Sequence, residues 1–174
     1  MKSKPLLPAE WAPQSAVMLT WPHHNTAWAS HLVQTEPVFM AITRAVLRFE
    51  AVLISCEDPE QAQQLQEQLN HYVETAGVAF RVRVLVAPSD HSWARDHGPL
   101  TVLTYRDSWL VDFSFNAWGN KFPWGKDNAL TNKLLTAGAF DGSTLKSVKF
   151  ILEGGAIDTD GEGTLLTTSQ CLLS

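Results

Sequence analysis

Residues 80–99 read FRVRVLVAPSDHSWARDHGP, and the rest of the chain is interpreted outward from this stretch. Apolar side chains occupy every second position from 80 to 86, which is the period of a half-buried β-strand. Pro88 ends that pattern, so Trp93 to Asp96 are expected in a loop at the end of a strand, where binding residues are often found. The structural alternative is a turn in which Asp96 is a cap and Trp93 covers the core.

Similar patterns elsewhere predict a chain in which strands and helices alternate. Strands are expected near 15–20, 51–55, 80–86, 100–105, 108–113, 148–151, 155–159 and 163–167. The absence of a strict βαβ period favours small mixed ββαβ units, so the expected fold class is α/β.

Three helices are predicted between these strands. The first begins near Glu36 with Pro37 in its first turn, and the second covers the polar run Glu57 to Asn70 after the cap and first position supplied by Asp58-Pro59. A shorter helix is expected from Asp127 through Leu135. The first helix is expected to bury Val38, Ile42, Ala45, Val46 and Phe49, and the second to place Leu65, Leu69 and Tyr72 on one side.

Composition indicates one globular domain of ordinary type. The 174 residues are 45% hydrophobic and 18% charged, with a net charge of -5. That charge argues against nucleic-acid binding and mildly favours cationic small molecules. The sequence has no apolar signal stretch and no run long enough to span a membrane, and its two cysteines form no disulfide framework. We therefore expect a cytoplasmic protein.

Cofactor and metal sites are not predicted. His23 and His24 are adjacent and would point to opposite faces of an extended segment, and the spacing of His91 and His97 fits no common zinc signature. The sequence contains no glycine-rich phosphate cradle and no Gly-x-Ser-x-Gly elbow. Nucleotide cofactors and serine hydrolysis are therefore not expected.

Further segments combine aromatic or acidic residues with glycine and turn residues. They are Val17 to Pro22 followed by Trp28, Asp112 to Asn120, Leu152 to Asp158, and Asp160 to Thr168. Together with Trp93 to Pro99, and in this order, they resemble the N-terminal half of the agmatine deiminase and bacterial-type (Porphyromonas-type) peptidyl-arginine deiminase family. The resemblance extends from about Trp11 to Leu173.

The resemblance implies a fold that periodicity alone does not show. Members of the family form a five-bladed, pseudo-symmetric propeller of ββαβ units, the pentein fold, of which about two to three blades would be present here. Residues 1–174 are thus expected to be a single partial deiminase domain. The family carries its His-x-Asp pair and its cysteine nucleophile in the half that this chain lacks. Open strand edges should promote a dimer, a swapped assembly or poor solubility.

The resemblance also implies an activity, the hydrolysis of agmatine to N-carbamoylputrescine and ammonia in putrescine biosynthesis. A guanidinium is a planar, permanent cation, which carboxylates bind through paired hydrogen bonds and a thiolate attacks. Asp96 matches the first guanidinium-binding carboxylate and Glu153 the second acidic residue. Trp93 would form a wall against the cation. Asn116 and Trp118 are expected to shape the pocket, and no cofactor is implied.

Structural alternatives stand beside these roles. Asp96 could pair with Arg95 or cap a turn, and Glu153 could cap the N–H groups of Gly154 and Gly155. Arg95 would point away from Asp96 in an extended backbone and is expected to brace the loop. Trp21, Trp28, Trp109 and Trp124 are expected to be core or rim aromatics.

Neither cysteine is expected to be catalytic. Cys56 and Cys171 do not match the family's catalytic position, and free cysteines are commonly small buried hydrophobes. A non-catalytic remnant or a binding module for guanidinium or polyamine ligands is therefore the alternative function. Within the enzyme class, the alternative substrate is peptidyl-arginine.

Overall fold

The computed structural model describes residues 4–140 and 142–173, which form a mixed α/β structure in two compact units. The first, the parallel unit, comprises Gln14–Ala94 and Asn132–Ala139. The second, the mixed unit, comprises the described residues of Met1–Pro13, Arg95–Thr131 and Phe140–Ser174.

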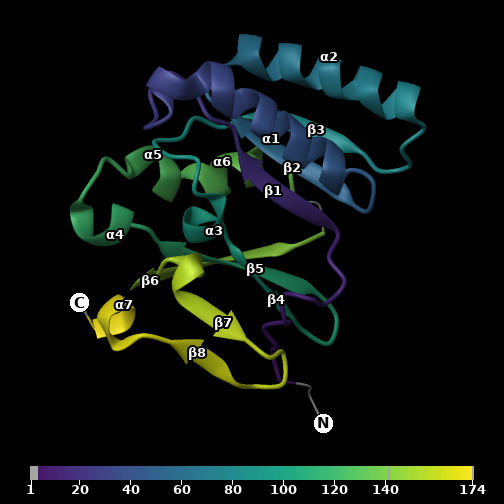
Figure 1. The fold of residues 1–174 in the computed structure, drawn as a ribbon. Coiled ribbons are helices and arrows are strands. Elements are labelled where there is room, and N and C mark those ends of the chain that lie inside the picture. Colours follow the sequence, from purple (N-terminus) through teal and green to yellow (C-terminus); the bar gives the residue numbers. More distant parts are fainter. Residues whose placement is uncertain (1–3, 141, 174) are drawn as a thin grey trace. The chain divides into compact units, whose positions relative to one another are not determined.

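The parallel unit contains a three-stranded sheet in the order β1-β2-β3, with all strands parallel (Figure 1). Its strands are β1 (Ala16–Thr20), β2 (Ala51–Cys56) and β3 (Val82–Val86), and its connections contain η1 (Ala29–His31), α1 (Leu32–Val46) and α2 (Pro59–Ala76). Every residue of β2 from Val52 to Cys56 is buried, and β2 is the central strand of the sheet.

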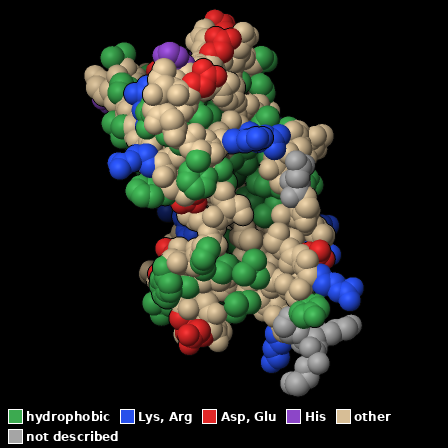
Figure 2. All heavy atoms as spheres, turned by 90° about the vertical axis from the view of Figure 1, so that its right-hand side faces the viewer, with side chains coloured by type: hydrophobic (Ala, Val, Ile, Leu, Met, Phe, Trp, Pro, Cys, Tyr) green, Lys and Arg blue, Asp and Glu red, His purple; other side chains and the backbone are tan. Residues whose placement is uncertain are grey.

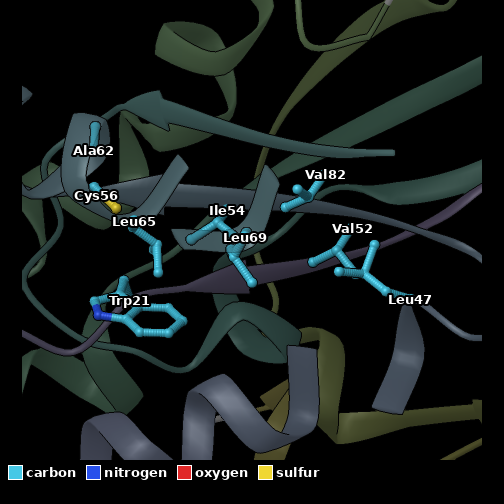
Figure 3. Packing of buried hydrophobic residues seen from close by; sticks show 9 residues of the cluster. All are labelled: Trp21, Leu47, Val52, Ile54, Cys56, Ala62, Leu65, Leu69 and Val82. Carbon is cyan, nitrogen blue, oxygen red and sulfur yellow. The ribbon is translucent and has the colours of Figure 1, made fainter. Parts of the chain in front are cut away.

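The core of this unit lies between the sheet and its two long helices. Leu65 and Leu69 of α2 pack with Val52 and Ile54 of β2, and Phe39 of α1 packs against the same cluster. Both helices therefore cover the same face of the sheet. Figure 3 shows the nine buried hydrophobic residues of this cluster, which are Trp21, Leu47, Val52, Ile54, Cys56, Ala62, Leu65, Leu69 and Val82.

Helix α2 confirms the predicted start. The Asp58 side chain accepts a hydrogen bond of 2.9 Å from the Gln61 N–H, and Pro59 is the first helical residue. The helix continues beyond its predicted end to Ala76, where Gly77 adopts the left-handed conformation at φ 64°. Leu65 and Leu69 are buried as predicted.

Helix α1 differs from its prediction in both start and orientation. It begins at Leu32, so Pro37 lies inside the helix rather than in its first turn. Of the predicted buried stripe only Val46 is partly buried. The other four residues of that stripe are exposed, namely Val38, Ile42, Ala45 and Phe49.

Two threonines explain this difference. Thr35 and Thr43 occupy the buried face of α1, where their hydroxyls donate to the carbonyl groups of His31 (2.9 Å) and Phe39 (2.8 Å). A threonine that satisfies its hydroxyl within its own helix can be buried without leaving an unpaired donor. The apolar stripe in the sequence is therefore not the face that packs on the sheet.

The mixed unit has the ββαβ order that was expected. Its strands β4 (Leu100–Leu103) and β5 (Ser108–Ser114) are antiparallel, and β6 (Thr144–Ile151) pairs parallel to β5 (Figure 1). The chain between β5 and β6 contains α4 (Ala117–Asn120), α5 (Gly125–Asn128) and α6 (Leu130–Thr136), the last of which continues into residues of the parallel unit. The single helix predicted from Asp127 is thus two short helices, and β6 begins earlier than predicted.

A hairpin and short helices complete the mixed unit. Asp160 lies in the hairpin turn, where its Oδ1 accepts from the N–H groups of Glu162 (2.8 Å) and Thr164 (3.0 Å). A hydrogen bond from the Thr164 hydroxyl contributes most to lowering the pKa of Asp160, and these backbone hydrogen bonds lower it further. The remaining elements of the mixed unit are α3 (Ala94–His97), η2 (Gly154–Ala156), β7 (Ile157–Thr159), β8 (Leu165–Thr167) and α7 (Ser169–Leu173). The first residue of α3, Ala94, belongs to the parallel unit.

Hydrophobic side chains also occur on the surface. Figure 2 shows them beside charged side chains on the face drawn there. Within the described residues, none of the helices combines the length and apolar character needed to cross a membrane.

Candidate functional site

Asp96 lies in α3 and is partly buried. Its Oδ1 accepts a hydrogen bond of 3.1 Å from the backbone N–H of Gly155 in η2. The fold of the mixed unit therefore brings Asp96 to the segment that follows Glu153, although the two are far apart in the sequence.

Two glycines make this approach possible. A Cβ atom at Gly154 would lie 2.2 Å from the carbonyl oxygen of Arg95, and one at Gly155 would lie 2.4 Å from Oδ1 of Asp96. Both distances are far below van der Waals contact. At Gly154 the neighbour is backbone of α3, so glycine is required there by close packing, whereas at Gly155 the neighbour is the end of the Asp96 side chain.

Glu153 directly precedes η2 in an extended conformation and is partly buried. Its side chain makes no capping hydrogen bond to η2, so the structural alternative proposed for it is wrong. The Gly155 N–H is bound instead by Asp96, a carboxylate from another segment. The carboxylate of Glu153 is thus not used as a cap.

Arg95 braces the segment, as expected, but in a helical backbone rather than an extended one. Its Nη2 forms an ion pair with Glu10 and donates to the carbonyl oxygen of Ile157 at 3.3 Å. The guanidinium therefore links α3 to the N-terminal segment and to β7 within the mixed unit.

Asn116 and Trp118 lie in an unusually shaped turn. The Asn116 Oδ1 accepts from the Gly119 N–H at 3.0 Å, while Trp118 adopts a left-handed conformation at φ 55°. The Trp118 indole packs edge-on against Phe115 and Phe122, with ring centroids 5.3 Å and 6.1 Å away. Local strain at a bulky residue marks positions whose conformation the surroundings enforce.

A buried acid lies on the strand before this turn. Asp112 of β5 is buried, and burial raises the pKa of its carboxyl group, an effect that a hydrogen bond with the Thr131 side chain opposes. In the sequence Asp112 belongs to the motif from Asp112 to Asn120, and no role of its own was predicted for it.

Trp93 lies near the end of the loop that follows β3 in the parallel unit. Trp93 is 51% exposed, so only about half of this residue is covered by packing. The preceding residue, Ser92, accepts a hydrogen bond of 2.6 Å from the indole N–H of Trp28. Trp28 is thus a residue that holds the loop, and Trp21 is a core aromatic at 3% exposure, as expected.

Cys56 has the character of a buried, inert thiol. Burial, with a smaller contribution from the nearby charge of Asp58, raises the pKa of the Cys56 thiol to about 12. At neutral pH only about one molecule in 10⁵ would carry the thiolate. Cys171 lies in α7 and is partly buried.

One polar cluster was missed by sequence reasoning. His23, Glu57 and Ser89 meet in the parallel unit, each from a loop that follows a parallel strand. Side chains placed just after parallel strands converge at the carboxyl edge of the sheet, and this positional rule could have identified them.

Comparison with known proteins gives consistent matches over nearly the whole chain. The profile of the Porphyromonas-type peptidyl-arginine deiminase family matches residues 6–174. The agmatine deiminase of Stutzerimonas stutzeri is 36% identical over an alignment of 174 positions, which covers 97% of this chain and 44% of that protein. A Pseudomonas aeruginosa agmatine deiminase is 34% identical with the same coverage. The chain thus spans less than half the length of the curated relatives it matches.

Solved structures agree with these matches. C. jejuni agmatine deiminase with substrate bound superposes with a TM-score of 0.82 and 32% identity, over 98% of this chain and 47% of that one. Enterococcus faecalis agmatine deiminase gives 0.74 and 31%, over 97% and 44%. The predicted fold class, an α/β chain that corresponds to part of the deiminase propeller, is confirmed.

Proposed function

Because this chain belongs to the Porphyromonas-type peptidyl-arginine deiminase family, we propose that it binds the guanidinium group of agmatine for hydrolysis to N-carbamoylputrescine and ammonia. The observation that carries the proposal is the Asp96 carboxylate held against the segment that follows Glu153. Agmatine is the first candidate substrate because the curated relatives are agmatine deiminases.

In this proposal the two carboxylates hold the cation. Oδ1 of Asp96 is fixed by the Gly155 N–H, so the carboxylate has a defined orientation toward a ligand. Each carboxylate oxygen has two acceptor positions, which leaves capacity for guanidinium N–H groups. Glu153, which directly precedes η2, supplies the second carboxylate.

The chemistry then requires a nucleophile. A thiolate adds to the guanidinium carbon, and ammonia leaves after a histidine protonates it, which gives an S-alkylthiouronium intermediate. Water adds to that carbon, the C–S bond breaks, and the ureido product forms. Cys56 is unsuited to this role because its thiol stays protonated at neutral pH. We propose that the thiolate and the histidine are supplied by another polypeptide segment or by a second chain.

Isothermal titration calorimetry with agmatine tests the proposal. The parent chain should bind agmatine, and Asp96→Asn should weaken binding at least tenfold because it removes the charge that pairs with the guanidinium, a loss of about 1.4 kcal/mol or more. The matched control is Asp158→Asn, which removes an exposed carboxylate on β7 of the same unit. Absence of binding, or equal binding by Asp96→Asn and the parent, would refute the proposal.

Because the Cys56 thiol stays protonated at neutral pH, a second candidate function is a module that binds guanidinium groups without turnover. An ammonia assay on the same samples distinguishes the two, since agmatine binding without ammonia release supports the module. Titration of an N-acylated arginine peptide tests the peptidyl-arginine alternative. Tighter binding of that peptide than of agmatine would assign the chain to protein-bound arginine.

A further inference from the structure

Arg95 brings a guanidinium group of the chain itself close to Asp96. A Cβ atom at Gly155 would lie 2.4 Å from Oδ1 of Asp96 and 3.7 Å from Cγ of Arg95. The stem of Arg95 and the carboxylate of Asp96 therefore lie beside the same residue of η2. The flexible stem beyond Cγ is long enough to bring the guanidinium to that carboxylate.

The Arg95 side chain has the same chemical group as the proposed ligand. Arginine and agmatine each carry a planar guanidinium, which pairs with a carboxylate through two parallel hydrogen bonds. If Arg95 turned toward Asp96, it would occupy the acceptor positions that the ligand needs. A partner within the same molecule also acts at a high effective concentration. Binding of a ligand by Asp96 therefore requires that Arg95 be held elsewhere.

Glu10 holds Arg95 in another direction. Nη2 of Arg95 forms an ion pair with Oε1 of Glu10 and donates to the carbonyl oxygen of Ile157 at 3.3 Å. Asp96 accepts the Gly155 N–H instead. The side chains of Arg95 and Glu10 are 52% and 56% exposed, and an ion pair this exposed contributes little to the stability of a fold. Its effect on ligand binding can therefore be measured separately from folding.

The N-terminal segment places Glu10 at this point. Leu6 exchanges two backbone hydrogen bonds with Leu103 of β4, at 2.9 Å and 2.8 Å (Figure 1). Ala9 packs on the hairpin between β7 and β8, where a Cβ atom at Gly161 would lie 2.7 Å from the Ala9 nitrogen. Glu10 directly follows these two attachments, and all of these residues belong to the mixed unit.

We propose that Glu10 is a positioning residue that holds the Arg95 guanidinium away from Asp96 and so prevents it from competing with a guanidinium ligand. The inference rests on the proposed function and adds to it a residue that does not itself touch the ligand. Loss of the Glu10 charge should release Arg95 to the nearby carboxylate. Removal of Arg95 should then restore ligand binding.

Calorimetry with agmatine tests this rescue. Glu10→Gln keeps the size of the side chain but removes its charge, so agmatine affinity should fall about fivefold. Arg95→Met removes the guanidinium and should bind agmatine within about twofold of the parent. The double variant should also bind as the parent does, because it holds no competing guanidinium. Asp107→Asn is the control, since it removes an exposed carboxylate between β4 and β5, and it should have no effect.

The pattern of affinities distinguishes a competitor from a brace. If Arg95 served only to brace α3, Arg95→Met should weaken agmatine binding as much as Glu10→Gln, and the double variant should not recover. That result would overturn the inference, as would equal affinity of Glu10→Gln and the parent. The melting temperatures of these variants should stay close to that of the parent, because the ion pair is exposed.

A crystal structure of Glu10→Gln tests the inference without a ligand. The Arg95 guanidinium should lie within hydrogen-bonding distance of the Asp96 carboxylate. A guanidinium that keeps its place at the Ile157 carbonyl would contradict the role of Glu10. A parent chain that does not bind agmatine refutes the proposed function, and this crystal structure then still decides whether Glu10 controls the position of Arg95. A parent that binds agmatine while Glu10→Gln binds equally well refutes the inference alone.

Discussion

A substitution at Gly155 is expected to change ligand binding without changing the stability of the fold. A Cβ atom there would lie 2.4 Å from Oδ1 of Asp96, the movable end of a side chain. Gly155→Ala should therefore push the Asp96 carboxylate aside at little cost to folding. We expect agmatine affinity to fall at least tenfold, about 1.4 kcal/mol, in calorimetry while the urea midpoint stays the same. An unchanged affinity would show that the orientation of Asp96 is unimportant.

Gly154 is the contrasting neighbour. Its missing Cβ would lie 2.2 Å from a backbone atom, the Arg95 carbonyl oxygen, which cannot move without displacing α3. Gly154→Ala should lower the free energy of unfolding by about 1–3 kcal/mol, as measured by urea denaturation. A variant as stable as the parent would contradict the close packing of η2 on α3.

Cys56 gives a prediction on the pH dependence of stability. The folded state holds its thiol pKa at about 12 against an ordinary 9.0, so above pH 9 the unfolded chain loses a proton that the folded chain keeps. This stabilisation is complete below pH 9 and decreases as the pH rises toward 12. Between these values, the unfolding free energy of the parent should fall faster than that of Cys56→Ala, by about 1.4 kcal/mol per pH unit. Parallel pH profiles would show that Cys56 ionises normally.

Local sequence patterns predicted candidate residues around Asp96 and Glu153 but not the contacts that these residues make. Asp96 and Glu153 were both considered as caps, and the structure gives the N–H of Gly155 to Asp96 rather than to the neighbouring Glu153. That choice depends on a contact between segments distant in sequence, which local patterns cannot show. The same limit hid the meeting of His23 with Glu57 and Ser89.

At the scale of elements, capping was predictable and helix orientation was not. Asp58 and Pro59 set the start of α2 through bonds within a few residues, so the sequence contains the whole signal. The buried face of α1 depends instead on how Thr35 and Thr43 satisfy their hydroxyls. Apolar periodicity alone favoured the wrong side.

The orientation of α1 can be tested by two substitutions. Ile42 is exposed and Phe39 packs against the core cluster. Ile42→Gln should change the free energy of unfolding by less than about 0.5 kcal/mol, whereas Phe39→Ala should cost about 3 kcal/mol. Urea denaturation measures both. A large loss for Ile42→Gln with a small one for Phe39→Ala would restore the face predicted from periodicity.

At the scale of the whole chain, the alternation of strands and helices was predicted well because buried strands are locally apolar. All eight predicted strands correspond to β1 through β8, with shifted ends. The assignment of strands to sheets was not predicted, since pairing depends on contacts across long segments such as residues 115–143 between β5 and β6.

Self-association is predicted from the mixed unit. In the order β4-β5-β6 the strand β6 is at the edge, and Val148, Phe150 and Ile151 are exposed on it. Exposed apolar edges pair with other chains. Sedimentation velocity should show a concentration-dependent coefficient for the parent that Phe150→Lys abolishes. Tyr105→Lys, at an exposed position outside β6, is the control. A parent that stays monomeric at all concentrations would contradict the prediction.

The central claim is that Asp96 and Glu153 hold a guanidinium group. A crystal structure of the parent chain with agmatine tests it most directly. The account predicts guanidinium nitrogens within hydrogen-bonding distance of both carboxylates, with the Gly155 N–H still bound to Asp96. Agmatine bound elsewhere, or bound through its amine with neither carboxylate in contact with the guanidinium, would contradict it.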